Sequence, residues 1–353
     1  MIRIIGLEQR EEWDGIVQSF ERFDVYYLSG YVHAFMLHGD GIPILVYVEK
    51  DATRAMSVYM KRDVADDKKL KGFECGKYFD LITPYGYGGL VFEGDVNEKS
   101  VKNICEELAI CYQSEHIIAE FVRWHPVLQN ANLVRGIIDV IDLGSTIHMD
   151  TTSEEVIWQN ITSKNRNTIR RAERNGITIE HSDDPELFHD FVEIYNQTMD
   201  RDHVEEYYYF KDAFYQSIAV ELKGKYELFY AVHEDKIIAM SIILFVNRQV
   251  HYHLSGSLSE YRNLNPSNLL LYKVACWAAK QGYKTFHMGG GVGSGIDNLY
   301  KFKQSFNRNS CNQFSISKII HNLEAYNEVL SYRKQNDKEF NNCLLYTSDA
   351  ADD

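Results

Sequence analysis

Apolar and polar positions alternate along the first 145 residues in a way that predicts an α+β domain. Three apolar or alternating runs predict adjacent antiparallel strands, at Ile42–Glu49, Ala55–Lys61 and Phe79–Thr83. A helix from about Glu98 to Ser114 and a strand over Ile117–Arg123 follow. We therefore treat residues 1–145 as one domain.

A second α+β stretch follows, over residues 146–342. Thr152 and Glu155 have the spacing of a capping box, so they predict the start of a helix, which Gly176 ends. Two more helices are expected, ending near Asp200 and Leu222. A three-stranded meander comes next, at Tyr226–His233, Ile237–Val246 and Gln249–Gly256.

The meander leads to a helix, a strand and a glycine-rich loop. The helix is expected at Asn268–Gln281 with Gly282 as its cap, and the strand at Tyr283–Met288. Residues 287–306 then read HMGGGVGSGIDNLYKFKQSF, in which Lys303 stands between Phe302 and Phe306. The glycines allow backbone N–H groups to approach an anion closely. A tight turn beside two core phenylalanines explains the same pattern.

Composition limits the classes of protein that fit. The chain has 353 residues, is 45% hydrophobic and carries a net charge of −14, which argues against indiscriminate binding to nucleic acid. Its start lacks the pattern of a signal peptide and no apolar run is long enough to cross a membrane, so a cytoplasmic, not membrane-embedded, protein is expected. The six cysteines form no C-x-x-C pair.

The last eleven residues, CLLYTSDAADD at 343–353, are set apart from the fold. They resemble the translation of a sequencing-library adapter, so we expect them to be a non-native tail that replaces the genuine C-terminus.

One predicted helix carries a basic cluster in an otherwise acidic chain. Lys164, Arg166 and Arg170 lie within SKNRNTIRRAERNGI, and positions 166 and 170 share a helix face. Such a face suits a polyphosphate or an RNA backbone. A solvated helix face paired with nearby acids is the alternative.

The order of helix, antiparallel strands, loop, helix and strand is similar to that of the GNAT acyltransferase superfamily. In that superfamily a loop before the helix binds the pyrophosphate of coenzyme A through its amides. The matching stretch is RNLNPSN, where the resemblance implies donor binding by Arg262, Asn265, Ser267 and Asn268. Asn265 and Ser267 stand where that loop has small residues, which is a departure from the pattern.

Four segments resemble a narrower branch, the Fem family of peptidoglycan bridge-forming aminoacyltransferases and its GNAT N-acetyltransferase relatives. They are DLITPYGYGG at 80–89, SKNRNTIRRAERNGI at 163–177, the run at 265–291 and NLYKFKQSFN at 298–307. The resemblance implies two tandem GNAT-like lobes, each a mixed, mostly antiparallel sheet flanked by helices. It also implies an acceptor site between the lobes. The long helical arm that some members use to hold tRNA is absent from this sequence.

The resemblance also implies roles for individual residues. Lys303 is expected to stabilise the oxyanion of acyl transfer, with Phe302 beside the substrate. Arg201 is expected to contact acceptor phosphates. Further substrate contacts are expected from Asp80, Tyr85, Gly290 and Gly291.

Tyr252 lies on a predicted strand from which its hydroxyl reaches the cleft and relays a proton. Its neighbours His251 and His253 form no metal site in our interpretation, because a third ligand is not evident.

The sequence therefore predicts an N-acyltransferase that moves an acyl or aminoacyl group to an amine of a cell-envelope precursor, either peptidoglycan or saccharide. We expect no tightly bound cofactor and no DNA partner. The donor is aminoacyl-tRNA or acyl-CoA. Two alternatives remain: an acyl-CoA-dependent N-acetyltransferase acting on a small amine, and a non-catalytic protein that binds a phosphorylated ligand.

Overall fold

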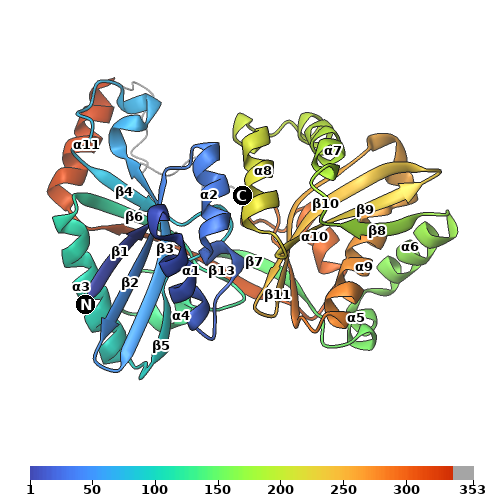
Figure 1. The fold of residues 1–353 in the computed structure, drawn as a ribbon, viewed down its shortest axis with the longest axis horizontal. Coiled ribbons are helices and arrows are strands. Elements are labelled where there is room, and N and C mark those ends of the chain that lie inside the picture. The colour runs from blue at the N-terminus through green and yellow to red at the C-terminus, as the bar shows by residue number, and fades with distance from the viewer. Residues whose placement is uncertain (337–353) are drawn as a thin grey trace. The chain divides into compact units, whose positions relative to one another are not determined.

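The computed structural model describes residues 1–336, which form two compact units (Figure 1). Of the described residues, the first unit contains 1–144 and 313–336, and the second contains 145–312. The expectation of a non-native tail at 343–353 lies outside the described residues.

The first unit is a mixed sheet with helices on both faces. Its strands are β1 (Ile2–Gly6), β2 (Ile42–Lys50), β3 (Thr53–Asp63), β4 (Phe79–Ile82), β5 (Val91–Gly94), β6 (Ile117–Arg123) and β13 (Asn312–Ile320). Its helices are α1 (Arg10–Ser19), α2 (Ser29–His38), α3 (Glu98–Ser114), α4 (Ala131–Val134) and α11 (Leu323–Asn336). The sheet runs β1-β2-β3-β4-β6-β13, and β5 pairs with β3. The pair β4–β6 is parallel and the other pairs are antiparallel.

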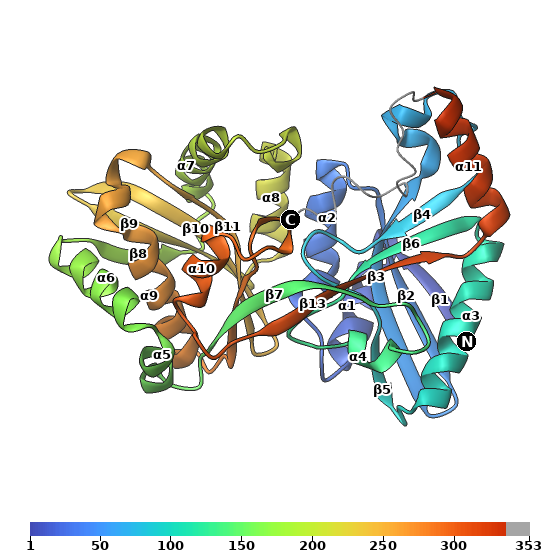
Figure 2. The same cartoon turned by 180° about the vertical axis from the view of Figure 1, so that it is seen from behind.

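Strand β6 is buried along its whole length because helices cover both faces of the sheet (Figure 2). Ile117 and Val122 join one apolar cluster with Ile104 and Leu108 of α3. Ile118, Ala119 and Phe121 join another cluster with α11. This double burial explains why IIAEFV is apolar at every position except Glu120.

The second unit is also a mixed sheet between helices. Its strands are β7 (Ile141–Asp150, which begins in the first unit), β8 (Thr178–Ser182), β9 (Tyr226–His233), β10 (Lys236–Val246), β11 (Gln249–Ser257) and β12 (Thr285–Gly289). Its helices are α5 (Glu154–Asn160), α6 (Ser163–Arg174), α7 (Leu187–Asp202), α8 (Asp212–Glu221), α9 (Pro266–Lys280) and α10 (Asn298–Gln304). The order is β7-β12-β11-β10-β9-β8, in which only β11–β12 is parallel.

Helices α9 and α7 cover opposite faces of this sheet. Phe229 of β9 packs on Trp277 of α9 at a ring distance of 5.5 Å. Tyr226, three residues earlier and therefore on the other face, packs on Phe188 of α7 at 5.6 Å. Helix α7 also approaches β11 so closely that Gly256 contacts the backbone of Ile194.

The expected elements at Glu98–Ser114, Ile117–Arg123 and Tyr226–His233 are confirmed to the residue. The single helix expected between Thr152 and Gly176 is wrong, because the chain forms α5 and α6 with a break between them. Ser153 rather than Thr152 caps α5, and Thr162 accepts a hydrogen bond from the N–H of Asn165 to cap α6. The polar hydroxyl at 162 thus starts a new helix inside what resembled one amphipathic stretch.

The predicted second lobe extended to residue 342, whereas the chain leaves the second unit near residue 312. Strand β13 pairs with β6, and α11 packs on the same sheet. Ile316 and Val329 are buried there, so apolar burial draws the C-terminal segment into the first unit.

Among the described residues, no helix is both long enough and apolar enough to cross a membrane.

We predict that Gly256→Ala destabilises the protein by about 1–3 kcal/mol, because a Cβ at this position would lie 2.7 Å from the carbonyl oxygen of Ile194. The matched control is Gly295→Ala, where the Cβ meets Val292 O at an ordinary 3.4 Å. Chemical denaturation followed by tryptophan fluorescence checks both variants. Identical unfolding midpoints for the two would contradict the packing of α7 on β11.

Candidate functional site

A cavity of about 580 Å³ lies in the second unit, where the N-terminus of α9 meets β11, α7 and α10. Its volume is in the range of small-molecule sites. Seven of the residues predicted from the sequence line it: Arg201, Tyr252, Arg262, Asn265, Ser267, Asn268 and Phe302. The structure thus brings the predicted donor loop and the predicted proton-relay tyrosine to one cavity.

The first turn of α9 presents backbone N–H groups that no side chain caps within the described part of the chain. Asn265 precedes the helix with a left-handed backbone (φ 62°), and Pro266 occupies the first helical position. The side chain of Asn265 donates instead to the carbonyl of Asn263, at 2.9 Å. Because the N–H groups that follow Pro266 lack a helical partner, this end of α9 favours an anion.

Helix α6 supports this end of α9 through a side-chain hydrogen bond. Asn268 Nδ2 donates to Asn165 Oδ1 at 2.8 Å. Asn165 is 3% exposed, and its own Nδ2 has no hydrogen-bond partner among the described residues. The sequence analysis missed Asn165, because an asparagine in a basic amphipathic helix resembles any other polar residue of its exposed face.

Two arginines reach the cavity wall, and they differ in what they already bind. The guanidinium of Arg201 contacts both carboxylate oxygens of Asp202, at 2.9 and 3.1 Å, and the carbonyl of Ser257 at 3.0 Å. Arg262 is exposed, and its guanidinium makes no hydrogen bond or ion pair with the described residues. Arg262 is therefore the cation better placed to meet an incoming phosphate.

A β-bulge in β11 places Tyr252 and Ser255 on the same face of the sheet. The register pairs Ile242 with Leu254 but Ile243 with Tyr252, so one residue of β11, His253, has no counterpart in β10. Residues three apart on a regular strand point to opposite faces, and the extra residue reverses that relation. The Tyr252 hydroxyl donates to Ser255 Oγ at 2.5 Å. Burial raises the pKa of Tyr252.

Beyond His251, the edge of β11 beside the cavity pairs with no other strand among the described residues. Its parallel pairing with β12 covers three positions and ends at His251 and His287. Farther along, the N–H and carbonyl of Ser257 bond to the side chains of Thr198 and Arg201, and therefore face this edge. Since backbone groups alternate in direction along a strand, the N–H of Ser255 faces it as well.

Lys303 lies beneath the glycine-rich loop rather than on the cavity wall. Its Nζ donates to the carbonyl of Gly290 at 2.6 Å, and the residue is 9% exposed. Burial lowers the pKa of Lys303 to about 8, although nearby Asp297 acts in the opposite direction. Phe302, its neighbour on α10, does line the cavity and packs on Phe306 at 5.4 Å.

The glycine-rich loop encloses a carboxylate of the chain itself. Asp297 caps α10 by accepting from the N–H of Tyr300 at 2.7 Å, and its other oxygen accepts from the N–H of Val292 at 3.3 Å. A Cβ on Gly291 would lie 2.3 Å from Asp297 Oδ1, which explains the glycine there. Gly290 and Gly291 therefore contact Lys303 and Asp297, and this part of the loop serves to order α10.

The three predicted cations of α6 have different surroundings. Arg166 donates to the carbonyls of Trp158 and Ile161, at 3.2 and 2.7 Å, and so caps the end of α5. The guanidinium of Arg170 lies 5.0 Å from the ring centroid of Trp158. Lys164 is exposed.

Asp80 and Tyr85 belong to the first unit. The carboxylate of Asp80 is buried and accepts two hydrogen bonds from Arg62, at 2.8 and 2.9 Å. Burial raises the pKa of Asp80, and Arg62 acts against that rise. Tyr85 stacks on Phe35 at 5.4 Å, and its carbonyl accepts a hydrogen bond from Tyr31.

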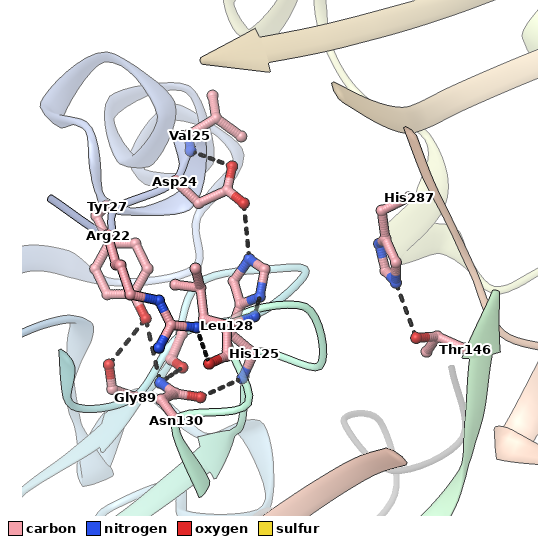
Figure 3. A network of polar contacts seen from close by, with 11 residues as sticks. Arg22, Asp24, Val25, Tyr27, Gly89, His125, Leu128, Asn130, Thr146 and His287 are labelled. Atoms are coloured by element: carbon pink, nitrogen blue, oxygen red, sulfur yellow. Dashed lines mark hydrogen bonds and ion pairs between the residues drawn. The ribbon is translucent and has the colours of Figure 1, made fainter. Parts of the chain in front are cut away.

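The first unit also contains a buried Asp24–His125 pair that the sequence analysis did not identify (Figure 3). His125 Nδ1 accepts from the N–H of Leu128 at 3.1 Å, so the proton shared with Asp24 at 2.9 Å resides on Nε2. Both ring nitrogens are thus engaged, and the pair joins two distant segments of the unit. In the second unit, His287 Nε2 lies 2.9 Å from the hydroxyl of Thr146, a contact that Figure 3 also draws.

Residues 163–303 match the family model described as acetyltransferase (GNAT) domain. Every residue that lines the cavity lies within this stretch. Residues 163–303 form a GNAT domain. No curated protein matches the chain in sequence.

Solved structures share the fold at low sequence identity. FemX is 14% identical, and the match covers 94% of this chain and 100% of that chain with a TM-score of 0.66. A protein of unknown function from Bacteroides thetaiotaomicron is 12% identical, with 90% and 100% covered and a TM-score of 0.59. L-PGS from Bacillus licheniformis is 13% identical, with 95% and 98% covered and a TM-score of 0.52. These matches extend beyond the GNAT domain and confirm the predicted α+β fold of two tandem lobes.

The depressed pKa of Lys303 predicts a pH-dependent stability. Between pH 8 and its ordinary pKa of 10.5 the unfolded chain binds this proton while the folded chain releases it, so stability rises with pH. We expect wild type to gain up to about 3 kcal/mol relative to Lys303→Met across this window. Denaturant unfolding at several pH values measures the difference.

Lys301→Met, an exposed position on the same helix, is the control and should leave the pH profile of wild type unchanged. A constant difference between wild type and Lys303→Met from pH 7 to 10.5 would show that the amine is not held in a desolvated site.

Proposed function

We propose that this protein is an N-acyltransferase that moves an acyl or aminoacyl group from an activated ester or thioester to an amine of a cell-envelope precursor, either peptidoglycan or saccharide. The observation that supports it most is the cavity in which the uncapped N-terminus of α9 and the free edge of β11 meet. The N-terminus of α9 suits the phosphate of a donor, and the edge of β11 suits the reacting carbonyl of that donor.

The transfer needs an oxyanion donor where the carbonyl is attacked. The amine nitrogen attacks the donor carbonyl, the new N–C bond forms and negative charge develops on the carbonyl oxygen. The backbone N–H of Ser255, facing the free edge of β11, suits that oxygen. The bond from the carbonyl carbon to the leaving oxygen or sulfur then breaks, and the product is an amide.

Tyr252 suits the proton transfer that completes the reaction. The attacking amine loses one proton and the leaving group gains one, so a relay between them is required. A tyrosine hydroxyl is already protonated at neutral pH, and burial raises the pKa of Tyr252 further, so this hydroxyl holds a proton for the leaving group. Its hydrogen bond to Ser255 holds the hydroxyl beside the proposed oxyanion donor.

Lys303 has a positioning role in this proposal. Its amine holds the carbonyl of Gly290, and its helix carries Phe302 to the cavity. Stabilisation of the oxyanion by Lys303 itself remains a prediction from the Fem resemblance, since the contact of Nζ is with the protein backbone.

Aminoacyl-tRNA is the donor that the surface of α6 favours. Helix α6 packs on α9 through the Asn165–Asn268 hydrogen bond, and Lys164, Arg170 and Arg171 are exposed on it. A row of exposed cations beside an anion-binding helix end suits a ligand with phosphates beyond the one bound in the cavity. Acyl-CoA is the second option, because the N-terminus of α9 by itself suits a pyrophosphate and needs no cations from α6.

We predict that transfer to envelope precursors from a charged tRNA pool is abolished by ribonuclease. Mass spectrometry of the product measures it. Replacing both Lys164 and Arg171 by Glu should raise the KM for the tRNA at least tenfold, because two favourable phosphate contacts become repulsive. Lys223→Glu, exposed after α8, is the control and should leave the KM unchanged.

Activity that survives ribonuclease and requires acyl-CoA would contradict the tRNA donor and support the acetyltransferase alternative. Absence of product from both donors, with phosphorylated ligands still bound, would support the non-catalytic alternative instead.

A further inference from the structure

A second cavity, of about 530 Å³, lies in the first unit beneath α3. Strands β3, β6 and β13 form its base, and the turn at residues 136–138 closes one side. Every residue that lines it belongs to the first unit, so it is separate from the cavity at α9.

A buried carboxylate lies at the base of this cavity. Glu120 is 5% exposed on β6, and apolar residues flank it on both sides along the strand. Its Oε1 accepts from the Tyr59 hydroxyl at 2.6 Å, and its Oε2 contacts His321 Nε2 at 3.0 Å. Each carboxylate oxygen accepts two hydrogen bonds, so Glu120 retains capacity for a further donor.

A second polar group in the same wall lacks a partner. Tyr112 of α3 is 2% exposed and lines the cavity, and its hydroxyl has no hydrogen-bond partner among the described residues. Leaving a buried hydroxyl unpaired is unfavourable, so such groups in native proteins usually meet a water or a ligand. Tyr112 also packs edge-on against His321 at 5.0 Å, which keeps its ring beside the Glu120 contacts.

The charged and aromatic side chains of the cavity indicate which kind of ligand it binds. Glu98, Glu106 and Glu120 line it, against one lysine, Lys102, which lies 3.9 Å from Glu106. Three aromatic side chains contribute to the walls, namely Tyr59, Tyr112 and Trp124. Carboxylates together with ring faces favour an organic cation, because ring faces attract ammonium groups.

The cavity offers binding rather than a reaction. Burial raises the pKa of the Cys105 thiol to about 12, so the one cysteine in its wall remains protonated. The pKa values of Tyr59 and Tyr112 are also raised well above 10 by burial. None of these groups is an activated nucleophile.

We propose that this cavity is a binding site for a small organic ammonium with an apolar body, whose charged end meets Glu120 and Tyr112 and whose body lies against Trp124 and Ile319. The site does not depend on the acyl transfer proposed for the second unit. Its role is recognition of an amine by the first unit.

Fluorine NMR of protein labelled with 5-fluorotryptophan tests this proposal. The chain has four tryptophans, and Trp124 is the one that lines this cavity. The probe is 2-phenylethylamine, compared with its neutral analogue 2-phenylethanol and its anionic analogue 3-phenylpropionate. We expect the amine alone to shift the Trp124 resonance in a saturable manner, with the resonance assigned through Trp124→Phe.

Two variants separate the charge from the volume of the site. Glu120→Gln keeps the shape and removes the charge, and it should weaken binding of the amine about tenfold or more. Ala109→Leu fills the cavity from a helical position with a good helix former, so it should fold and also weaken binding. Glu115→Gln, exposed at the end of α3, makes the same charge change outside the cavity and should bind like wild type.

The proposal is overturned if 2-phenylethylamine leaves the Trp124 resonance unchanged, or if the neutral alcohol shifts it at the same concentrations. It is also overturned if the folded Ala109→Leu protein binds the amine as tightly as wild type.

Discussion

The site of the second unit depends on one irregularity, the extra residue in β11. Without a bulge at His253, the side chains of Tyr252 and Ser255 would point to opposite faces of the sheet. With it, the two hydroxyls meet at 2.5 Å on the face that α9 covers. Pairing with β12 ends at His251, next to the bulge, so the strand also gains an open edge at the same place. A hydroxyl pair, an exposed strand edge and a helix N-terminus thus converge because one strand contains one additional residue.

The surrounding elements hold this arrangement by close contacts of the backbone. Gly256 allows α7 to approach β11, and Thr198 and Arg201 of α7 then bond to Ser257 on the open edge. On the other side, Lys303 and Asp297 order the loop before α10, which brings Phe302 to the cavity. These side chains satisfy backbone groups, so their effect on the site is to fix the positions of others. Lys303 in particular acts from behind the cavity wall, through the carbonyl of Gly290.

The resemblance to GNAT proteins implied the donor loop, and the alternating pattern of a strand placed Tyr252. Ser255 and Asn165 were not predicted, and each omission has a physical reason. Ser255 reaches the site only because the bulge changes the face on which it lies, and regular alternation assigns it to the wrong side. Asn165 becomes important only when α6 packs on α9, a contact between segments about a hundred residues apart. The return of residues 313–336 to the first unit is also a long-range effect, since β13 completes a sheet whose other strands precede residue 124.

The rate of transfer by Tyr252→Phe tests the central claim most directly, because this change removes one oxygen atom and leaves the ring in its packing. We predict that kcat falls about 100-fold or more while the KM for the donor stays within twofold of wild type, since the hydroxyl acts on the leaving group and not on the phosphates. Tyr261→Phe, outside the cavity, should retain full activity. A folded Tyr252→Phe protein with the kcat of wild type would contradict the assignment of this cavity as the centre of acyl transfer.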